Sequence, residues 1–337
     1  MTTPLYQIGT FAAGNRLLDA DQRTVQSSTD RTNAITSGHR ACRGCGEALA
    51  ARVVLDAAQR TAQGRMVTVN ATGCLEVFST PYPESAWQLP WLHSLFGNAA
   101  AVASGVAAAL RATGRDDIRV VAQAGDGGTV DIGLGCLSGM FERNDDVFFI
   151  CYDNQGYMNT GVQRSGATPP AASTATSRPV GGSVGNSFGT GKSLPQIAIA
   201  HEIPYVATAT VADLHDLEAK VVTAMGQHGA RYLHVLVPCP LGWGTESAET
   251  VRIARLAVRS GLFPVFEAEH GQVTRVTPIR QRVPVEDYLR PQARFAHLFR
   301  GEGRPDVVAA LQARADRYIA RFGLLAEEPE IRDEART

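Results

Sequence analysis

Short apolar segments alternate with helical patterns along most of this chain, and that alternation limits the folds it can adopt. The apolar segments resemble strands that are buried on both faces, and apolar residues recur at helical spacing between them. This order predicts an α/β fold with a doubly wound, mostly parallel sheet covered by helices on both faces. Strands are predicted over 66–70, 118–122, 147–152, 205–208 and 232–237. Helices are predicted over 47–62, 98–112, 132–141, 194–200, 211–227, 251–260 and 306–321.

Composition suggests how the chain is divided. Residues 1–37 are polar and aperiodic, which indicates an extension wrapped on the surface or on a partner. Residues 164–191 are rich in Ser, Thr, Gly, Ala and Pro, which predicts a long loop that is mobile until a partner covers it. We expect a cofactor-binding domain over 38–245. A C-terminal extension over 246–337, with a short strand pair at 264–277, is expected to pack on that domain or on partner subunits.

The bulk composition argues against several classes of protein. Hydrophobic residues make up 44% of the 337 residues, enough for a sizeable core, and the net charge is −1. The chain has no basic run suited to nucleic acid and no apolar run long enough to span a membrane. Residues 1–30 lack the pattern of a signal peptide, so we expect a cytoplasmic protein. Six cysteines without an export signal suggest metal or redox use rather than disulfides.

Two polar motifs follow neighbouring predicted strands. Gly125-Asp126-Gly127 comes after one strand, and Asp153-Asn154 comes after the next. A carboxylate and an amide oxygen suit Mg²⁺, and the glycines let backbone N–H groups approach a diphosphate. The helix expected to begin near Asp131 would direct its positive end at the same group. Gly-Asp-Gly alone is a common turn, but 26 residues separate Gly127 from Asn154, and this spacing resembles the thiamine diphosphate fingerprint.

Four cysteines have a spacing that suggests one metal centre. Cys42 and Cys45 form a C-x-x-C pair between glycines, Cys74 follows after 28 residues, and Cys239 after a further 164. Thiolates at four positions suit an iron–sulfur cluster or zinc, and the wide spacing favours the cluster over a zinc ribbon. Structural thiols are the third interpretation. Cys136 and Cys151 fall inside a predicted helix and strand and are expected in the core. His93 lies in the aromatic stretch 87–96 and is expected to pack rather than to act in catalysis.

Several longer motifs resemble the beta subunits of 2-oxoacid:ferredoxin oxidoreductases, and of the pyruvate branch in particular. The opening motif is Gly38-His39-Arg40-Ala41-Cys42-Arg43-Gly44-Cys45-Gly46. The others are 72–77 with 79–83, 98–105, 157–161 with 163–165, 238–240 before Gly242-Trp243, and 282–289. The resemblance covers about residues 38 to 300. It departs from the family pattern in the N-terminus, the apparent insertion at 181–191 and the tail beyond about Arg300.

The resemblance implies a set of cofactors and residues. It implies a fold that binds thiamine diphosphate through its diphosphate half, with one [4Fe–4S] cluster held by the four cysteines. Asp126, Asn154 and the Gly156 carbonyl would ligate Mg²⁺. Asn159 would face the reacting centre, and Thr160 would lie near the phosphates. Among the further cofactor contacts we place Gly73 and His39, although a plain loop role for His39 is equally open.

The resemblance also implies an activity and partners. The complex would convert pyruvate, coenzyme A and oxidised ferredoxin reversibly into acetyl-CoA, CO₂ and reduced ferredoxin. An alpha-type subunit would supply the pyrimidine-binding domain and the activating glutamate, a role that we reject for Glu47 and Glu76. A ferredoxin-like subunit or domain would carry electrons onward. Three alternatives stay open: another 2-oxoacid (branched-chain, aromatic or oxalate), a non-redox thiamine diphosphate decarboxylase with structural zinc, and a zinc-stabilised assembly subunit.

Overall fold

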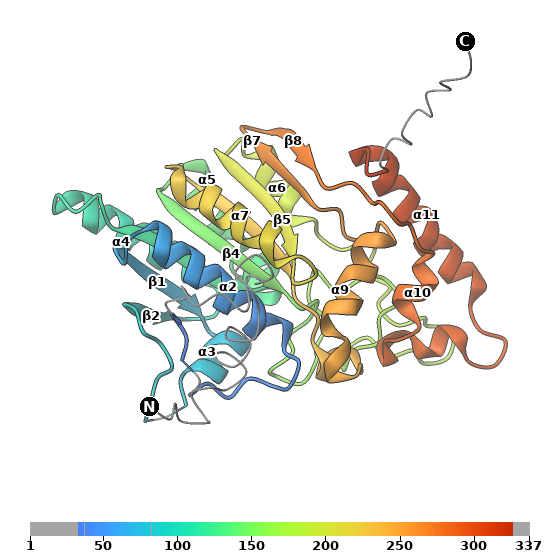
Figure 1. Cartoon of the computed structure of the whole chain (residues 1–337). Helices are drawn as coiled ribbons and strands as arrows, with labels where there is room; N and C mark the ends of the chain where they lie inside the picture. Colours follow the sequence, from blue (N-terminus) through green and yellow to red (C-terminus); the bar gives the residue numbers. More distant parts are fainter. Residues whose placement is uncertain (1–32, 37, 82, 326–337) are drawn as a thin grey trace, which may run out of the picture.

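The computed structural model describes residues 33–36, 38–81 and 83–325, and these form one eight-stranded sheet flanked by helices (Figure 1). The strand order is β2-β1-β3-β4-β6-β5-β7-β8. The first six strands in this order are parallel, while β7 pairs antiparallel with β5 and β8 antiparallel with β7. The strands are β1 Met66–Ala71, β2 Trp91–Ser94, β3 Arg119–Gly125, β4 Val147–Asp153, β5 Tyr205–Thr210, β6 Arg231–Leu236, β7 Phe266–Glu269 and β8 Gln272–Val276. The predicted α/β class with a mostly parallel sheet is confirmed.

Helices cover both faces of the sheet. Helices α2 (Gly46–Thr61) and α7 (Leu214–Gly226) pack together over one face, and their side chains share a core with the sheet. Helices α4 (Ala99–Ala112), α5 (Leu134–Glu142) and α6 (Leu194–Ala200) contribute to the core on the other face. The remaining α-helices are α3 Cys74–Ser79, α8 Pro240–Trp243, α9 Thr250–Arg259, α10 Val285–Leu289 and α11 Pro305–Phe322.

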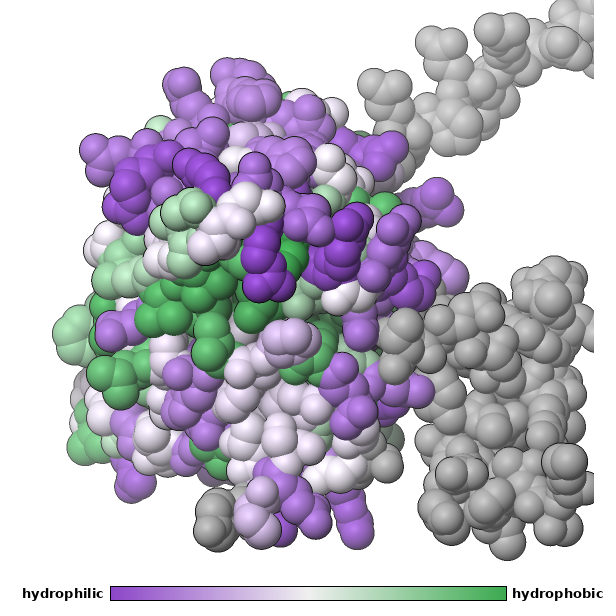
Figure 2. Space-filling view, turned by 90° about the vertical axis from the view of Figure 1, so that its left-hand side faces the viewer, coloured by the Kyte–Doolittle hydropathy of each residue, from purple (hydrophilic) through white to green (hydrophobic). Residues whose placement is uncertain are grey.

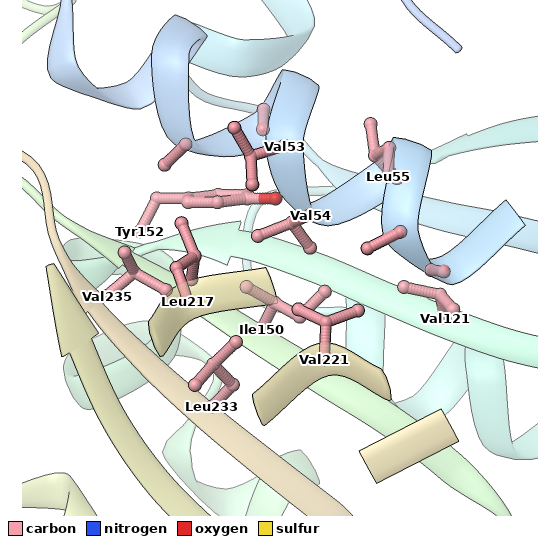
Figure 3. Close-up of a cluster of buried hydrophobic side chains, with 14 of the residues drawn as sticks. Val53, Val54, Leu55, Val121, Ile150, Tyr152, Leu217, Val221, Leu233 and Val235 are labelled. Atoms are coloured by element: carbon pink, nitrogen blue, oxygen red, sulfur yellow. The ribbon is translucent and has the colours of Figure 1, made fainter. Parts of the chain in front are cut away.

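Strand alternation divides the core between the two faces. Val121 and Ile150 belong to the cluster under α2 and α7, where they meet Val54 and Val221 (Figure 3). Their neighbours Val120 and Phe149 belong to the cluster under α4, α5 and α6. Because each fully buried Val, Ile or Phe side chain contributes about 1.5–3 kcal/mol, these two clusters hold the helices onto the sheet.

The C-terminal segment packs on the rest of the chain. A third core cluster joins Leu236 and Trp243 to Ile253 and Leu311 of α9 and α11. The expected strand pair is present as β7 and β8, and it extends the main sheet beyond β5. The residues before and after 245 share one sheet and one core cluster. A domain boundary at residue 245 therefore stays a prediction.

Some expectations need correction. The aromatic stretch contains an additional parallel edge strand, β2. The segment 164–191 contains none of the named helices or strands, as predicted, and part of it is buried: Ser165, Thr168, Ala172 and Asn186 are at most 1% exposed. Its mobility in the absence of a partner stays a prediction. Of the predicted N-terminal extension, residues 1–32 and 37 lie outside the described residues. Within the described residues, no helix combines the length and apolarity that a membrane crossing requires.

Candidate functional site: a glycine-lined cavity beside four cysteines

Four adjacent strands bring the predicted motifs to one edge of the sheet. The strands β1, β3, β4 and β6 are consecutive neighbours and run parallel, so their carboxyl ends meet at the same edge. Cys74, Asp126, Asn154 and Cys239 follow these strand ends in that order. Adjacent strands lie about 5 Å apart. Residues from four distant parts of the chain therefore gather along one short line, at the carboxyl edge where ligands bind in such sheets.

Asp126 presents one free carboxylate oxygen to this edge. The side chain is fully buried, and its Oδ2 accepts a hydrogen bond from the Ser165 hydroxyl. Its Oδ1 is buried and has no hydrogen-bond partner among the described residues. Burial, together with nearby Asp153, raises the pKa of Asp126 well above its usual value. A buried carboxylate with an unused oxygen is costly unless a cation pairs with it, so Asp126 fits a metal ligand.

Asn154 has the same arrangement one strand away. Its Nδ2 donates to Glu47 Oε2 at 3.3 Å, and its backbone carbonyl accepts from Trp243 Nε1 at 2.7 Å. Its Oδ1 is buried and likewise unpartnered among the described residues. The next residue, Gln155, has a φ of 67° and turns the chain sharply toward Gly156. The predicted magnesium residues are thus adjacent, with both free side-chain oxygens buried.

Glycines form much of the wall of the cavity between these residues, and at Gly127 the neighbouring groups leave no room for a side chain. A Cβ added at Gly127 would lie 2.4 Å from the Tyr157 ring, so a side chain there would need that ring to move. Gly127–Ile132 form a π-helix directly after β3, a conformation often found at functional sites. The helical segment therefore starts at the motif itself rather than near Asp131. The wall is lined by Glu47, Thr72, Gly73, Cys74, Phe96, Gly125, Asp126, Gly127, Gly128, Asn154, Gly156, Tyr157, Met158, Asn159 and Thr160.

Most predicted site residues lie in this wall, and two histidines need comment. Asn159 and Thr160 are exposed, and the Thr160 hydroxyl donates to Gln163 Oε1 at 2.6 Å. His39 is not among the lining residues; it packs edge-on against Phe78, so its cofactor contact stays a prediction. His93, expected only to pack, stacks on Trp91 and also pairs with the hydroxyl of Thr72, a lining residue, at 2.8 Å.

The four predicted cysteine ligands lie around the same edge. Cys45 caps α2 by accepting from Ala48 N–H at 3.4 Å, and Cys239 caps α8 by accepting from Gly242 N–H at 3.3 Å. The two loops touch, because a Cβ added at Gly46 would lie 2.7 Å from the carbonyl oxygen of Pro238. Cys74 lines the cavity itself.

The thiols are not gathered around one point. Within the described part of the chain, no three His, Cys, Asp or Glu side chains lie close enough to enclose a single metal ion. Burial raises the pKa of Cys45 to about 12, and it also raises the pKa values of Cys74 and Cys239. Cys42 is exposed. Because metals bind thiolates, a metal group held by Cys45, Cys74 and Cys239 would have to displace the protons of these thiols.

Glu47 is the site residue that the sequence interpretation missed. It lies in the first turn of α2, is 3% exposed, and accepts from Leu75 N–H at 3.1 Å as well as from Asn154. Burial raises its pKa to about 7. An acid directly after C-x-x-C-G was the available signal. Its neighbours match the predicted cluster motif, and its contact with Asn154 was therefore not predicted.

Comparison with known proteins agrees with this site. A family model described as "Thiamine pyrophosphate enzyme, C-terminal TPP binding domain" matches residues 71–235, which include Cys74, Asp126 and Asn154. The pyruvate synthase subunit PorB of Methanosarcina barkeri is 49% identical over 299 residues, which cover 88% of this chain and 99% of that subunit. The PorB of Methanothermobacter thermautotrophicus is 51% identical over 269 residues, 78% of this chain and 90% of its own.

A solved structure supports the fold. The 2-oxoglutarate:ferredoxin oxidoreductase from Magnetococcus marinus aligns with a TM-score of 0.53 at 21% identity, over 66% of this chain and 79% of that chain. At this identity the likeness concerns the fold alone. The predicted family and the thiamine diphosphate-binding fold are confirmed by the sequence relatives and the family model. With about half of its residues identical along nearly the full length of a PorB subunit, this chain belongs to the PorB family, the beta subunits of the 2-oxoacid:ferredoxin oxidoreductases.

Proposed function

We propose that this chain binds Mg²⁺–thiamine diphosphate and one [4Fe–4S] cluster in a complex that oxidises pyruvate. In the proposed reaction, pyruvate and coenzyme A give acetyl-CoA, CO₂ and a proton. The C1–C2 bond of pyruvate breaks, the coenzyme A sulfur bonds to C2, and two electrons pass singly to two ferredoxin molecules. The observation that carries the proposal is a single cavity wall containing Asp126, Asn154 and Cys74.

The diphosphate half of the proposal is supported by the donor set. Asp126 Oδ1 and Asn154 Oδ1 are buried acceptors without partners among the described residues, and the Gly156 carbonyl is the third proposed ligand. Mg²⁺ takes oxygen ligands of these kinds beside phosphate oxygens. Bound thiamine diphosphate would supply the carbanion-stabilising chemistry that releases CO₂ from a 2-oxoacid. The protein's own residues would hold the diphosphate, with Asn159 and Thr160 at the exposed part of the wall.

The cluster half is supported by the four cysteines. Thiolates at four positions suit a four-iron cluster. The wide spacing of the four cysteines along the chain is unlike that of a zinc ribbon, whose second pair follows closely as another C-x-x-C. Cys74 lies in the cavity wall, so a cluster on this thiol would be next to the thiamine site. We therefore favour the redox interpretation over a decarboxylase with structural zinc.

We also propose that partner subunits complete the site. An alpha-type subunit would supply the pyrimidine contacts and the activating glutamate, and a ferredoxin-like subunit or domain would carry electrons onward. The side of the molecule shown in Figure 2 carries a band of exposed apolar residues. Separately, Leu92 of the edge strand β2 and Leu95 just after it are 43% and 73% exposed, and Phe96, the next residue, lines the cavity. Such a surface beside the cavity suits a protein partner. All six cysteines are free, which agrees with a reducing, cytoplasmic location.

Anaerobic purification of the native complex tests this function. Iron, sulfide and thiamine diphosphate would be quantified per copy of this chain, and 2-oxoacids would be compared as substrates with coenzyme A and ferredoxin. We expect all three components, a larger partner subunit, and pyruvate as the preferred substrate. Zinc without sulfide would overturn the redox assignment. A branched-chain, aromatic or oxalate preference would overturn the pyruvate assignment alone.

A further inference from the structure

Glu47 uses its carboxylate in an unusual way for an acid in the first turn of a helix. Such acids usually favour their own helix terminus, where N–H groups lack partners. Glu47 instead accepts from Leu75 N–H at 3.1 Å and from Asn154 Nδ2 at 3.3 Å. Both partners lie in other elements, 28 and 107 residues away. The Glu47 carboxylate is 3% exposed, and both of its hydrogen bonds link α2 to other elements, while Cys45 caps the helix.

The contact with Asn154 decides which end of its amide faces the cavity. The carbonyl and amino ends of an asparagine side chain have nearly the same shape, so hydrogen bonds select the orientation. As a carboxylate, Glu47 Oε2 can only accept, so it selects the amino end and leaves Asn154 Oδ1 buried and unpartnered among the described residues. With the opposite orientation, the amino group would point at the cation and repel it.

Asp126 is oriented in a similar way, by a hydrogen bond to one of its two side-chain oxygens. Ser165, itself fully buried, donates its hydroxyl proton to Asp126 Oδ2, and Oδ1 stays free of partners in the described part of the chain. Each proposed side-chain ligand therefore has one polar atom bound to a second residue and one oxygen available to the metal. Glu47 also accepts a hydrogen bond from Leu75 N–H, and Leu75 directly follows Cys74. Glu47 therefore connects Asn154 to the cysteine segment, a connection that Ser165 does not make.

We propose that Glu47 is a positioning residue of the magnesium site, one that holds the Asn154 amide with its oxygen toward the cation. The inference rests on the proposed function, since it assumes a divalent cation between Asp126 and Asn154. Through Leu75, the same carboxylate ties that site to the segment that carries Cys74.

The test exchanges the hydrogen-bond acceptor at position 47 and the donor at position 154. In Glu47→Gln, one amide oxygen still accepts from Leu75 N–H, but the amide nitrogen meets Asn154 Nδ2, and two donors cannot pair. In Asn154→Asp, two carboxylates meet. In the double variant E47Q/N154D, the amide nitrogen introduced at position 47 donates to the carboxylate introduced at position 154. The second oxygen of that carboxylate stays free for the metal.

The readout is Mn²⁺ binding to the intact complex in the presence of thiamine diphosphate, followed by electron paramagnetic resonance. We expect each single variant to bind Mn²⁺ about 10- to 100-fold more weakly, the usual cost of losing a residue that orients a ligand. We expect the double variant to recover to within about fivefold of the parent, as coupled neighbours do. A purely structural role for Glu47 predicts no recovery, and that result would overturn the inference.

Control variants distinguish a failure of the proposed function from a failure of the role inferred for Glu47. Glu267→Gln changes another buried acid, which accepts from Tyr205 at 2.6 Å, and is expected to leave Mn²⁺ affinity unchanged. If Asp126→Ala binds Mn²⁺ normally, the proposed function fails. If Asp126→Ala loses Mn²⁺ while E47Q does not, only the role of Glu47 fails. Should E47Q not assemble, N154D is compared with the double variant, which must bind more tightly for the inference to stand.

Discussion

The diphosphate region and the cysteine region of this chain, its two candidate cofactor sites, share one edge of the sheet but differ in how firmly the fold holds their side chains. In the diphosphate region, Asp126 and Asn154 follow neighbouring strands, are buried, and each have one polar atom bound to a second residue. The cysteine region is assembled from separate loops, Cys42 is exposed, and the thiols do not converge on a single point among the described residues.

This difference indicates where the energy for organising each site comes from. Strands of one sheet hold their ends at fixed separations, so the side-chain oxygens proposed as ligands need no cation to bring them together. The raised pKa of the Cys45 thiol means that a proton would have to leave before the proposed cluster binds. Binding of that cluster would then contribute to the free energy that fixes the cysteine loops. Cofactor binding in the diphosphate region should therefore be sensitive to the loss of a single ligand atom. The arrangement of the cysteine region should instead depend on whether its metal group is bound.

The largest expected effect comes from removing the carboxylate of the diphosphate region. Asp126→Ala should lower thiamine diphosphate-dependent activity by at least about 10³-fold, because a metal ligand supplies several kcal/mol. Steady-state assays of the complex with added Mg²⁺ measure this. Asp145→Asn, which loses an ion pair with exposed Arg143, is the control and should stay near the parent. Normal activity in Asp126→Ala would remove the proposed magnesium site.

The next largest effect should be confined to the cysteine region. Cys74→Ser is expected to lose most of the iron and sulfide, since a hydroxyl replaces a soft thiolate ligand. Thiamine diphosphate affinity should stay within about threefold, because the free oxygens of Asp126 and Asn154 are untouched. Metal analysis and calorimetry follow the two sites separately. Cys136→Ser, in α5, is the control, and unchanged iron in Cys74→Ser would show that this ligand is assigned wrongly.

A chemical probe sharpens the comparison within the cysteine region. In cluster-free protein at pH 8, Cys45 with a pKa of about 12 is thiolate in only about one molecule in 10⁴. Iodoacetamide should therefore label exposed Cys42 at least about tenfold faster than Cys45. The Cys45 rate should rise with pH, because deprotonation increases steadily toward pH 12. Mass spectrometry reads each site, and equal rates at pH 8 would contradict the buried, protonated thiol.

The smallest expected effect tests the glycine wall. Gly127→Ala places a methyl group 2.4 Å from the Tyr157 ring, which must shift within the cavity. We expect a loss of about 1 kcal/mol in thiamine diphosphate binding, or about fivefold. Gly135→Ala, in the following helix, meets nothing within 4 Å and should leave binding unchanged. Calorimetry on both variants measures the difference, and equal affinities would mean that the wall tolerates a side chain.

Local pattern was sufficient for the elements that carry the motifs. The apolar strands before Asp126 and Asn154 and the helix after Cys45 lie within a few residues of their predicted bounds. A strand that is buried on both faces is almost entirely apolar, so it can be recognised from a short stretch of sequence. The edge strand β2 was not predicted, because it is partly exposed and does not form a continuous apolar run.

The sequence by itself determined which residue types stand at the strand ends, and hence the fold class, the family and the candidate ligands. Only the tertiary structure decided how those ligands are held. The contact of Glu47 with Asn154 spans 107 residues, and that of Ser165 with Asp126 spans 39. No periodicity or spacing encodes such pairs, because a hydrogen bond between distant segments depends on how the sheet and the helices bring them together.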